Sequence, residues 1–340
     1  MSLRFPNRRH ILMGAAALAA PTLMAGCDQR APIDDQGRIR LRIAVPGPAR
    51  ADYGGFYQAI AAGLYAKRNL NVQIFHGNSA EDVSLRLAAG TAELGLAMDS
   101  FTVLKMINEH APVKAVAAFF QKDPRVIIGR TRDGPRTLAD IGERPLYVED
   151  AGWPELWAWL RTRYDLKTDQ LIRPDTGALA PFLANEDSLL VGTLTREPAL
   201  VASAAPDLNT RLLLPANDGY GAYANLLMAT NAFGRDNVDA LKDFITATIE
   251  GWQEYLNGEA EQANALIRRA NPATPQGSLD TARQLLKSYG IVEGDPASIA
   301  TIGQMTSERW QTFAPQAEAS FNAEVDWKSA YTTEFLPPQG

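Results

Sequence analysis

Apolar and polar positions alternate regularly along most of this chain. In the part of the chain before residue 132, apolar runs of strand length lie at residues 41–45, 71–75, 93–98, 113–120 and 126–131. Amphipathic segments separate these runs, and the first of them repeats Phe56, Ile60 and Leu64 at four-residue steps. Because strands that alternate with helices are typical of a parallel sheet, this region predicts an α/β unit.

A second set of the same kind follows. Its strand-like runs lie at residues 145–149, 170–174, 188–194 and 210–215. Helical patterns lie between them at residues 153–163 and 198–205. The repetition of the strand–helix pattern predicts a second α/β unit.

The last third of the chain begins with a strand-like run at residues 224–230 and continues as helix. One face of a long helix at about 238–256 would carry Leu241, Ile245, Thr248, Trp252 and Tyr255. Residues 259–335 are mostly helical in pattern, with breaks at 271–277 and 290–296. These helices are predicted to rejoin the first unit.

The two α/β units predict two lobes with a cleft between them. Each lobe would hold a mostly parallel sheet flanked by helices. We expect the chain to cross between the lobes near 129–137 and 218–226. The predicted organisation is therefore a tether at 27–38, lobe 1 at 39–130 plus 225–340, and lobe 2 at 131–224.

Residues 1–26 have the pattern of an export signal. Arg4, Arg8 and Arg9 carry all the charge of this segment, and a run of Ala, Leu, Met and Gly follows. A membrane-spanning helix needs about 20 apolar residues, whereas this run is shorter and Pro21 interrupts it. Arg8 and Arg9 also resemble a twin-arginine signal, so both the Sec route and the twin-arginine route remain open.

Cys27 is the only cysteine of the 340 residues, and it follows the segment Leu-Met-Ala-Gly at 23–26. This ending resembles a bacterial lipobox, in which the thiol is acylated and the cysteine becomes the new N-terminus. The alternative is ordinary cleavage that leaves a free thiol. We predict that Cys27 anchors the mature chain on the periplasmic face of a bacterial membrane; which membrane retains it stays open.

The composition of the chain restricts which kinds of partner it can bind. Residues 1–26 contain three arginines and no acid, so their removal leaves 30 basic and 39 acidic residues, a net charge of −9. Such a chain is not expected to bind nucleic acid by general electrostatic attraction. With one cysteine it can form no internal disulfide. No later segment is long enough to cross a membrane, so membrane contact is expected through the lipid alone, and we expect a monomer.

Polar residues gather where predicted strands end, which is where ligands of open α/β sheets bind. These residues lie in the loops after the strands of the first lobe: Asp52, Asn78, Ser79, Asp99, Ser100 and Gln121. Each could equally be a helix N-cap, because Asn, Asp and Ser are the preferred caps. Aromatic residues at such loops are Tyr53, Phe56, Trp153, Tyr220 and Tyr223. Together they predict a cleft with a polar wall and aromatic contacts.

The stretch DYGGFYQAIAAGLYAKRNLNVQI at residues 52–74 resembles solute-binding proteins of ABC importers. The resemblance is to the group that takes up thiamine-pyrimidine precursors, riboflavin, taurine and other sulfonates. Further matches are FFQKDP, TREP, NALIRRANP, MTSERW and AYTTEF, at 119–124, 195–198, 264–272, 305–310 and 330–335. They follow one another in order over nearly all of the mature chain.

The resemblance implies a two-lobed periplasmic binding protein fold of the type II kind. It also implies that solute bound between the lobes closes them, and that an ABC permease recognises the closed form. No catalytic residue, metal or cofactor is expected. Pyrimidine binders of the group tend to carry a tryptophan in the first loop. This chain departs from that pattern, because residues 45–48 read Val-Pro-Gly-Pro and include no tryptophan.

An alternative is an enzyme related to fungal thiamine pyrimidine synthases, which share the fold. Those proteins consume one of their own histidines and need a cysteine-rich iron-binding motif. Downstream of residue 26 this chain has His76, His110 and no cysteine other than Cys27, which argues against that chemistry.

The expected solute is a pyrimidine-like or flavin-like heteroaromatic. The strand-end loops combine aromatic rings with neutral or acidic groups, and only Arg50, Lys122 and Arg196 could add positive charge nearby. A dedicated anion site would favour arginine. Helix N-termini could hold an anion without arginine, so a taurine-like sulfonate remains the alternative.

Overall fold

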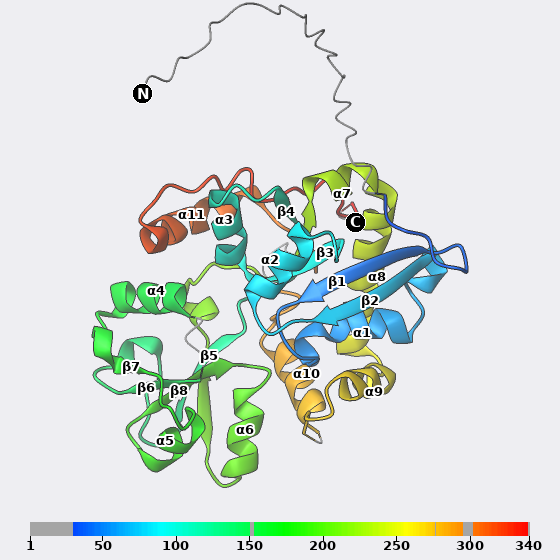
Figure 1. Ribbon diagram of the computed structural model, residues 1–340. Coiled ribbons are helices and arrows are strands. Elements are labelled where there is room, and N and C mark those ends of the chain that lie inside the picture. The colour runs from blue at the N-terminus through cyan, green and yellow to red at the C-terminus, as the bar shows by residue number, and fades with distance from the viewer. Residues whose placement is uncertain (1–29, 150–152, 276, 295–301, 339–340) are drawn as a thin grey trace, which may run out of the picture.

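The computed structural model describes residues 30–149, 153–275, 277–294 and 302–338 (Figure 1). The predicted signal segment and Cys27 lie outside these residues. The described chain forms two α/β lobes. In Figure 1 the first four strands of the chain, all in the first lobe, are blue to cyan, and the labelled strands of the second lobe are green. No described helix is both long enough and apolar enough to cross a membrane.

The first lobe is built on a five-stranded sheet of order β2-β1-β3-β10-β4. Its strands are β1 Ile39–Val45, β2 Leu70–His76, β3 Leu94–Asp99, β4 Val113–Phe120 and β10 Ala224–Thr230. Seven of the eight residues of β4 are buried. A nearly continuous apolar strand of this kind is typical of a sheet that is covered on both faces.

The second lobe repeats this arrangement with the order β7-β6-β8-β5-β9. Its strands are β5 Arg125–Arg130, β6 Leu146–Val148, β7 Leu171–Ile172, β8 Leu189–Thr193 and β9 Thr210–Leu213. In each sheet one strand runs against its two neighbours, β10 in the first and β5 in the second. Each of these strands follows a crossing between the lobes: β5 is the first strand of the second lobe, and β10 is the strand with which the chain returns to the first lobe.

The prediction of a mostly parallel, two-lobed α/β fold is confirmed, with one correction to its boundaries. We expected residues 125–130 to end the first lobe. The structure instead places this segment as β5 inside the second sheet, where it pairs with β8 and β9. The first crossing is therefore the short loop between β4 and β5, because an antiparallel strand needs no long connection to enter the next sheet.

Helices cover both sheets and the region between the lobes. In chain order they are α1 Gly54–Ala61, α2 Ala80–Ala88, α3 Ser100–Asn108, α4 Pro154–Tyr164, α5 Leu179–Ala184, α6 Glu197–Ala204, α7 Asn231–Asp236, α8 Val238–Asn257, α9 Glu261–Ala270, α10 Ser278–Ser288 and α11 Ser307–Phe321. Short 3₁₀ turns lie at η1 Ala51–Tyr53, η2 Ala66–Arg68, η3 Leu138–Asp140, η4 Thr168–Gln170 and η5 Pro215–Asp218. The C-terminal helices contact the second lobe as well as the first: α10 packs on α6 and α11 on α4.

Close packing of α1 against α8 fixes the loop that leads into the cleft. A Cβ atom at Gly251 would lie 2.3 Å from the carbonyl oxygen of Gly55, and one at Gly55 would overlap the Trp252 ring. The two helix backbones therefore approach closely only because both positions are glycine. This contact holds the start of α1, and with it residues 46–53, at a fixed distance from the core.

Candidate ligand-binding cleft

The larger of two cavities between the lobes has a volume of about 580 Å³. Its lining comprises Pro46, Gly47, Pro48, Arg50, Ala51, Asn78, Thr195, Arg196, Ala199, Leu200, Asn271, Ala273, Thr274, Pro275, Ser278 and Leu279. The first lobe contributes the loop after β1, the second lobe contributes the start of α6, and the α9–α10 connection closes the third side. These described lining residues include two guanidinium groups and no carboxylate.

A smaller cavity of about 40 Å³ adjoins the larger one, and both are lined by Pro46 and Arg50. Its remaining lining residues are Asp52, Tyr53, Met98, Asp99, Asp123, Pro124, Arg125, Trp153, Thr193, Ala224 and Asn225. The carboxyl ends of β3 and β4 and the start of β5 meet here, as expected for open α/β sheets. Arg50 thus stands between a basic cavity and a smaller, more acidic one.

Arg50 is held in place by its neighbours in η1. Its Nε atom lies 3.1 Å from Oδ2 of Asp52, and 30 % of its side chain remains exposed. The Asp52 carboxylate raises the pKa of Arg50 above its usual range. Burial raises the pKa of Tyr53 to about 12, so its hydroxyl stays protonated at neutral pH. That hydroxyl is buried beside the Arg50 guanidinium, which can only donate to it, so the hydroxyl's own proton has no acceptor among the described residues.

Asp52 also joins the two lobes. The Thr195 hydroxyl, in the second lobe, donates to Oδ2 of Asp52 over 2.8 Å. The side-chain amide of Asn225 donates to the Asp52 carbonyl over 2.7 Å. The same carboxylate therefore contacts Arg50 and Thr195, so a group that displaces it from Arg50 also changes the contact between the lobes.

Beneath the smaller cavity lies a buried charge cluster centred on Arg125. Its Nε donates to Asp123 Oδ1 over 2.8 Å, and its Nη2 donates to Asp99 Oδ2 over 2.7 Å. The same Nη2 lies 3.1 Å from the Tyr220 hydroxyl. Burial disfavours the charged guanidinium, but the attraction of Asp123 and the other partners raises the pKa of Arg125 well above its usual range. Two buried carboxylates thus share one cation.

Five of the residues predicted from the sequence line these cavities. Asp52, Tyr53, Asp99 and Trp153 face the smaller cavity, and Asn78 faces the larger one. Asp99 is at the same time the N-cap of α3, accepting from the backbone of Thr102 over 3.0 Å. Asp99 therefore caps a helix and also lines the smaller cavity, and its contact with a solute stays a prediction.

The other six predicted residues lie outside the lining of either cavity. Ser79 caps α2 by accepting from the backbone of Asp82, and the Ser100 hydroxyl accepts from the backbone of Tyr223. Phe56 is fully buried in the first-lobe core, with its ring centre 5.1 Å from that of Phe119. Their polar groups or rings are thus occupied by contacts within the protein.

Gln121, Tyr220 and Tyr223 are buried in the same way. The Gln121 amide donates to the carbonyls of Ala118 and Gln304, and the Tyr220 hydroxyl contacts Arg125. The Tyr223 ring lies under Arg309, whose Cζ is 3.9 Å from the ring centre. Tertiary packing turns these side chains inward, although their backbone lies at strand ends.

Comparison with known proteins places the chain in a family. The NMT1/THI5-like family model matches residues 50–262. The chain belongs to this family. The matched region contains both lobe crossings and most residues of the two cavities. A comparison with curated proteins found no match.

Solved structures share the fold of this NMT1/THI5-like chain at low sequence identity. The periplasmic aliphatic sulphonate binding protein SsuA from Escherichia coli is 16 % identical, with a TM-score of 0.65 over 86 % of this chain and 97 % of that one. SsuA from Xanthomonas axonopodis pv. citri, bound to MOPS, is 13 % identical, with a TM-score of 0.58 over 86 % and 94 %. A DszB mutant in complex with biphenyl-2-sulfinic acid is 10 % identical, with a TM-score of 0.56 over 87 % and 97 %. The likeness shows the fold.

Several cleft residues of this NMT1/THI5-like chain were missed by sequence reasoning. Arg125 was not among the candidates drawn from the sequence, although it directly follows the strand-end loop 121–124. Asn271 and Thr274 were missed because their loop joins two helices, and the rule that we applied considers only the ends of strands. The described residues contain no group of three or more His, Cys, Asp or Glu that could hold a metal ion.

His76 supports the cleft loop and gives it a pH dependence. Its Nδ1 lies 2.7 Å from the Gly47 carbonyl, and its Nε2 lies 2.7 Å from the Tyr57 hydroxyl. Burial lowers the pKa of His76 below its usual value of 6.5, so the neutral ring donates to Gly47 and accepts from Tyr57. The unfolded chain binds the proton more tightly than the folded chain. The stabilisation is therefore present above about pH 6.5 and is lost as the pH falls toward the folded pKa.

We expect this loss to appear as a lower melting temperature at pH 5 than at pH 7.5. The variant His76→Gln should show a smaller drop than the wild-type chain. His110→Asn, at an exposed left-handed position with φ of 61°, is the matched control and should keep the wild-type drop. Equal pH dependence in all three proteins would contradict this role of His76.

Proposed function

We propose that this protein is the solute-binding component of an ABC importer and that it captures a small organic anion between its lobes. The observation that carries the proposal is the lining of the larger cavity, which has Arg50 and Arg196 but no carboxylate among its described residues. The fold supports it, because structures with this fold include binding proteins for sulfonates. A monomer that hands its solute to an inner-membrane permease is the expected working unit.

The rest of the lining supports an anionic head on an apolar body. Pro46, Pro48, Leu200 and Leu279 offer aliphatic surface, and a volume of about 580 Å³ suits a small molecule. The helices α2, α6 and α10 begin at the cavity wall, and helix N-termini favour anions. Acids in the first turn, Asp82 in α2 and Glu197 in α6, already offset part of the positive charge at two of these ends. Most of the attraction would therefore come from the guanidinium groups.

A sulfonate would fit this arrangement through Arg50. The guanidinium carries hydrogen-bond donors in a planar fork that matches an oxyanion, and the Tyr53 hydroxyl beside it is a further donor. An incoming sulfonate would compete with Asp52 for Arg50. Because Asp52 also contacts Thr195, this competition would couple binding to the position of the second lobe.

A heteroaromatic solute is the second candidate, and Trp153 is the observation that favours it. Trp153 and Tyr53 line the smaller cavity, and the guanidinium carbon of Arg125 lies 5.7 Å from the Trp153 ring centre. A planar ring placed there could stack on Trp153, worth about 0.5–1.5 kcal/mol beyond burial. The described lining of the larger cavity contains no aromatic residue, which makes this candidate weaker than the anion.

Calorimetric titration of alkanesulfonates, the matching alkyl alcohols, pyrimidines and flavins would decide between the two candidates. We expect a sulfonate to bind and the alcohol of the same chain length not to bind. A heteroaromatic that binds tightly, and that loses at least tenfold in affinity in Trp153→Ala, would favour the second candidate. Binding of neither class would contradict the proposal.

The enzyme alternative has its own test. An exported enzyme related to thiamine pyrimidine synthases would form product from pyridoxal phosphate and iron in a single turnover. We expect no product and an unmodified His76 by peptide mass spectrometry. Formation of a pyrimidine product with loss of a histidine would replace the transport proposal.

Cys27 is proposed to be the lipid anchor of the mature chain. We expect Cys27→Ser to move the protein from the membrane fraction to the released fraction, because the lipobox-like segment has only this acceptor. The variant should still bind solute, since the cleft begins at residue 46. Unchanged membrane association of Cys27→Ser would contradict the anchor.

A further inference from the structure

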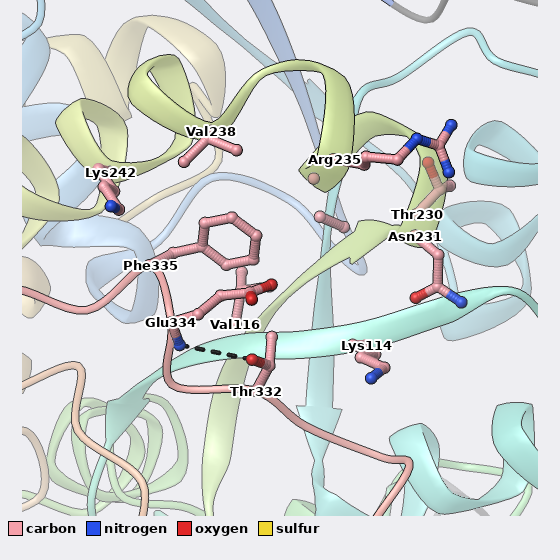
Figure 2. A pocket seen from close by; sticks show the side chains of 12 residues that line it. Lys114, Val116, Thr230, Asn231, Arg235, Val238, Lys242, Thr332, Glu334 and Phe335 are labelled. Carbon is pink, nitrogen blue, oxygen red and sulfur yellow. Dashed lines mark hydrogen bonds between the residues drawn. The ribbon is translucent and has the colours of Figure 1, made fainter.

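A basic groove lies on the first lobe outside the cleft, and the chain leads toward Cys27 close beside it. This α7 groove has a volume of about 500 Å³ and is lined by the cations Lys114, Arg235 and Lys242 around Val238 and Phe335 (Figure 2). We propose that the α7 groove binds the phosphate of anionic phospholipid headgroups in the membrane that holds the anchor. The proposal rests on the anchoring of Cys27 stated above.

The path of the chain brings the groove to the membrane. The backbone of Ala31 donates to the side-chain oxygen of Asn237 over 2.8 Å, between α7 and α8. Arg30 and Pro32 line a neighbouring depression of about 250 Å³, which shares Thr230 with the groove. Ala31 follows Cys27 by four positions, and four residue steps span about 14 Å at full extension. A lipid on Cys27 therefore keeps the α7 surface within roughly that distance of the headgroups.

The charge of the groove suits this partner. In Figure 2, Lys242 lies on one side of Phe335, and Lys114 and Arg235 lie on the other. Glu334 is the one carboxylate among the described lining residues. Arg235 pairs with Asp236 at 3.0 Å, whereas no described residue forms an ion pair with Lys114 or Lys242. The Lys114 and Lys242 ammonium groups are thus left to meet an anion from outside the chain.

Backbone hydrogen bonds and buried side chains hold the wall of the groove in a defined conformation. The C-terminal segment adds to the edge of β4, since Tyr331 forms a bridge to Ala115 and Thr332 donates to the Ala115 carbonyl over 2.9 Å. Phe335 is only 4 % exposed and packs against Gly234. Lys114 and the cations of α7 and α8 are thus presented from fixed backbone around an apolar floor. Phosphate contact at this place would fix how the cleft is oriented above the membrane.

The test attaches one acyl chain to the thiol of Cys27 in residues 27–340, since a single chain gives only weak, reversible membrane binding. Partition is measured by flotation with vesicles of phosphatidylcholine and with vesicles that contain phosphatidylglycerol. We expect at least tenfold stronger partition into the anionic vesicles at about 0.1 M salt, falling toward the neutral value at about 1 M salt as charges are screened.

Two triple variants give the decisive comparison. Lys114→Gln with Arg235→Gln and Lys242→Gln should lose the tenfold preference. Lys67→Gln with Arg132→Gln and Arg161→Gln removes the same charge from exposed positions elsewhere and should keep it. Melting curves verify that both variants fold. Equal partition of the wild-type chain into both vesicles, or equal losses in both variants, would overturn the proposal.

The source of the phosphate is tested separately. Glycerol phosphate in solution should not compete with the anionic vesicles at millimolar concentration. Competition would mean that the groove is a site for a soluble phosphate and would overturn the membrane role. Because the acyl chain is attached chemically and no solute is needed, this outcome is independent of the cleft titrations and of the Cys27→Ser fractionation.

Discussion

Replacing Arg50 with glutamine is expected to weaken binding of the anionic solute at least a hundredfold, or about 2.7 kcal/mol. A hydrogen bond to a charged group is worth about 1.5–3 kcal/mol, and this variant loses the charge as well as the fork of donors. It also leaves Asp52, now without its cation 3.1 Å away, to repel the solute. Isothermal titration calorimetry with the best-binding sulfonate measures the change directly.

Arg196→Gln is the matched control for this prediction. Half of the Arg196 side chain is exposed and its guanidinium already pairs with Glu197, so we expect a loss of about fivefold or less, as for an exposed ion pair. A melting temperature close to that of the wild-type chain verifies that Arg50→Gln is folded. An Arg50→Gln protein with wild-type affinity would contradict the assignment of Arg50 as the anion-binding residue.

Arg125→Met is expected to lower the free energy of unfolding by about 3–5 kcal/mol, the typical cost of removing one partner from a buried ion pair. The variant leaves Asp99 and Asp123 buried without their cation, at distances that now allow only repulsion. Urea unfolding at neutral pH measures the loss.

Two further variants distinguish this charge effect from a simple change of packing. Arg132→Met removes an exposed arginine and should cost less than about 0.5 kcal/mol. Adding Asp123→Asn to Arg125→Met removes one orphaned charge and should recover part of the stability. A double variant no more stable than Arg125→Met would show that the carboxylates are not the source of the loss.

The fold could be predicted from the sequence because local patterns decide most of it. All five residues assigned to one face of α8 are buried in the structure, since the 3.6-residue period alone determines which side chains share a face. The boundary at β5 could not be predicted in this way. An apolar run at residues 126–131 suits either sheet equally well, and only pairing with β8 and β9 decides which one it joins.

The site was predictable only in part, for a related reason. The rule that ligands lie at strand ends selects loops that line the two cavities, and so includes Asp52, Tyr53 and Trp153. It does not say which way a side chain points. Phe56 lies in the first turn of α1, directly after such a loop, and Tyr223 lies directly before β10, yet both fill the core because burying a large ring there stabilises the fold.

Arg50 and Arg125 show the same limit in electrostatic terms. Both lie near strand ends in the sequence, but the sequence does not reveal that two buried carboxylates pair with Arg125. Arg50 remains 30 % exposed on the shared wall of both cavities. The preference for a neutral heteroaromatic solute was drawn from residue types, whereas the proposal of an anion comes from where their charges lie.

Native mass spectrometry of the protein purified without denaturation from the cells that produce it tests the central claim most directly. The account predicts one bound small molecule with a sulfonate or other acidic group, present on the wild-type chain and absent from Arg50→Gln. A bound molecule without an acidic group, or one that Arg50→Gln retains in full, would contradict it.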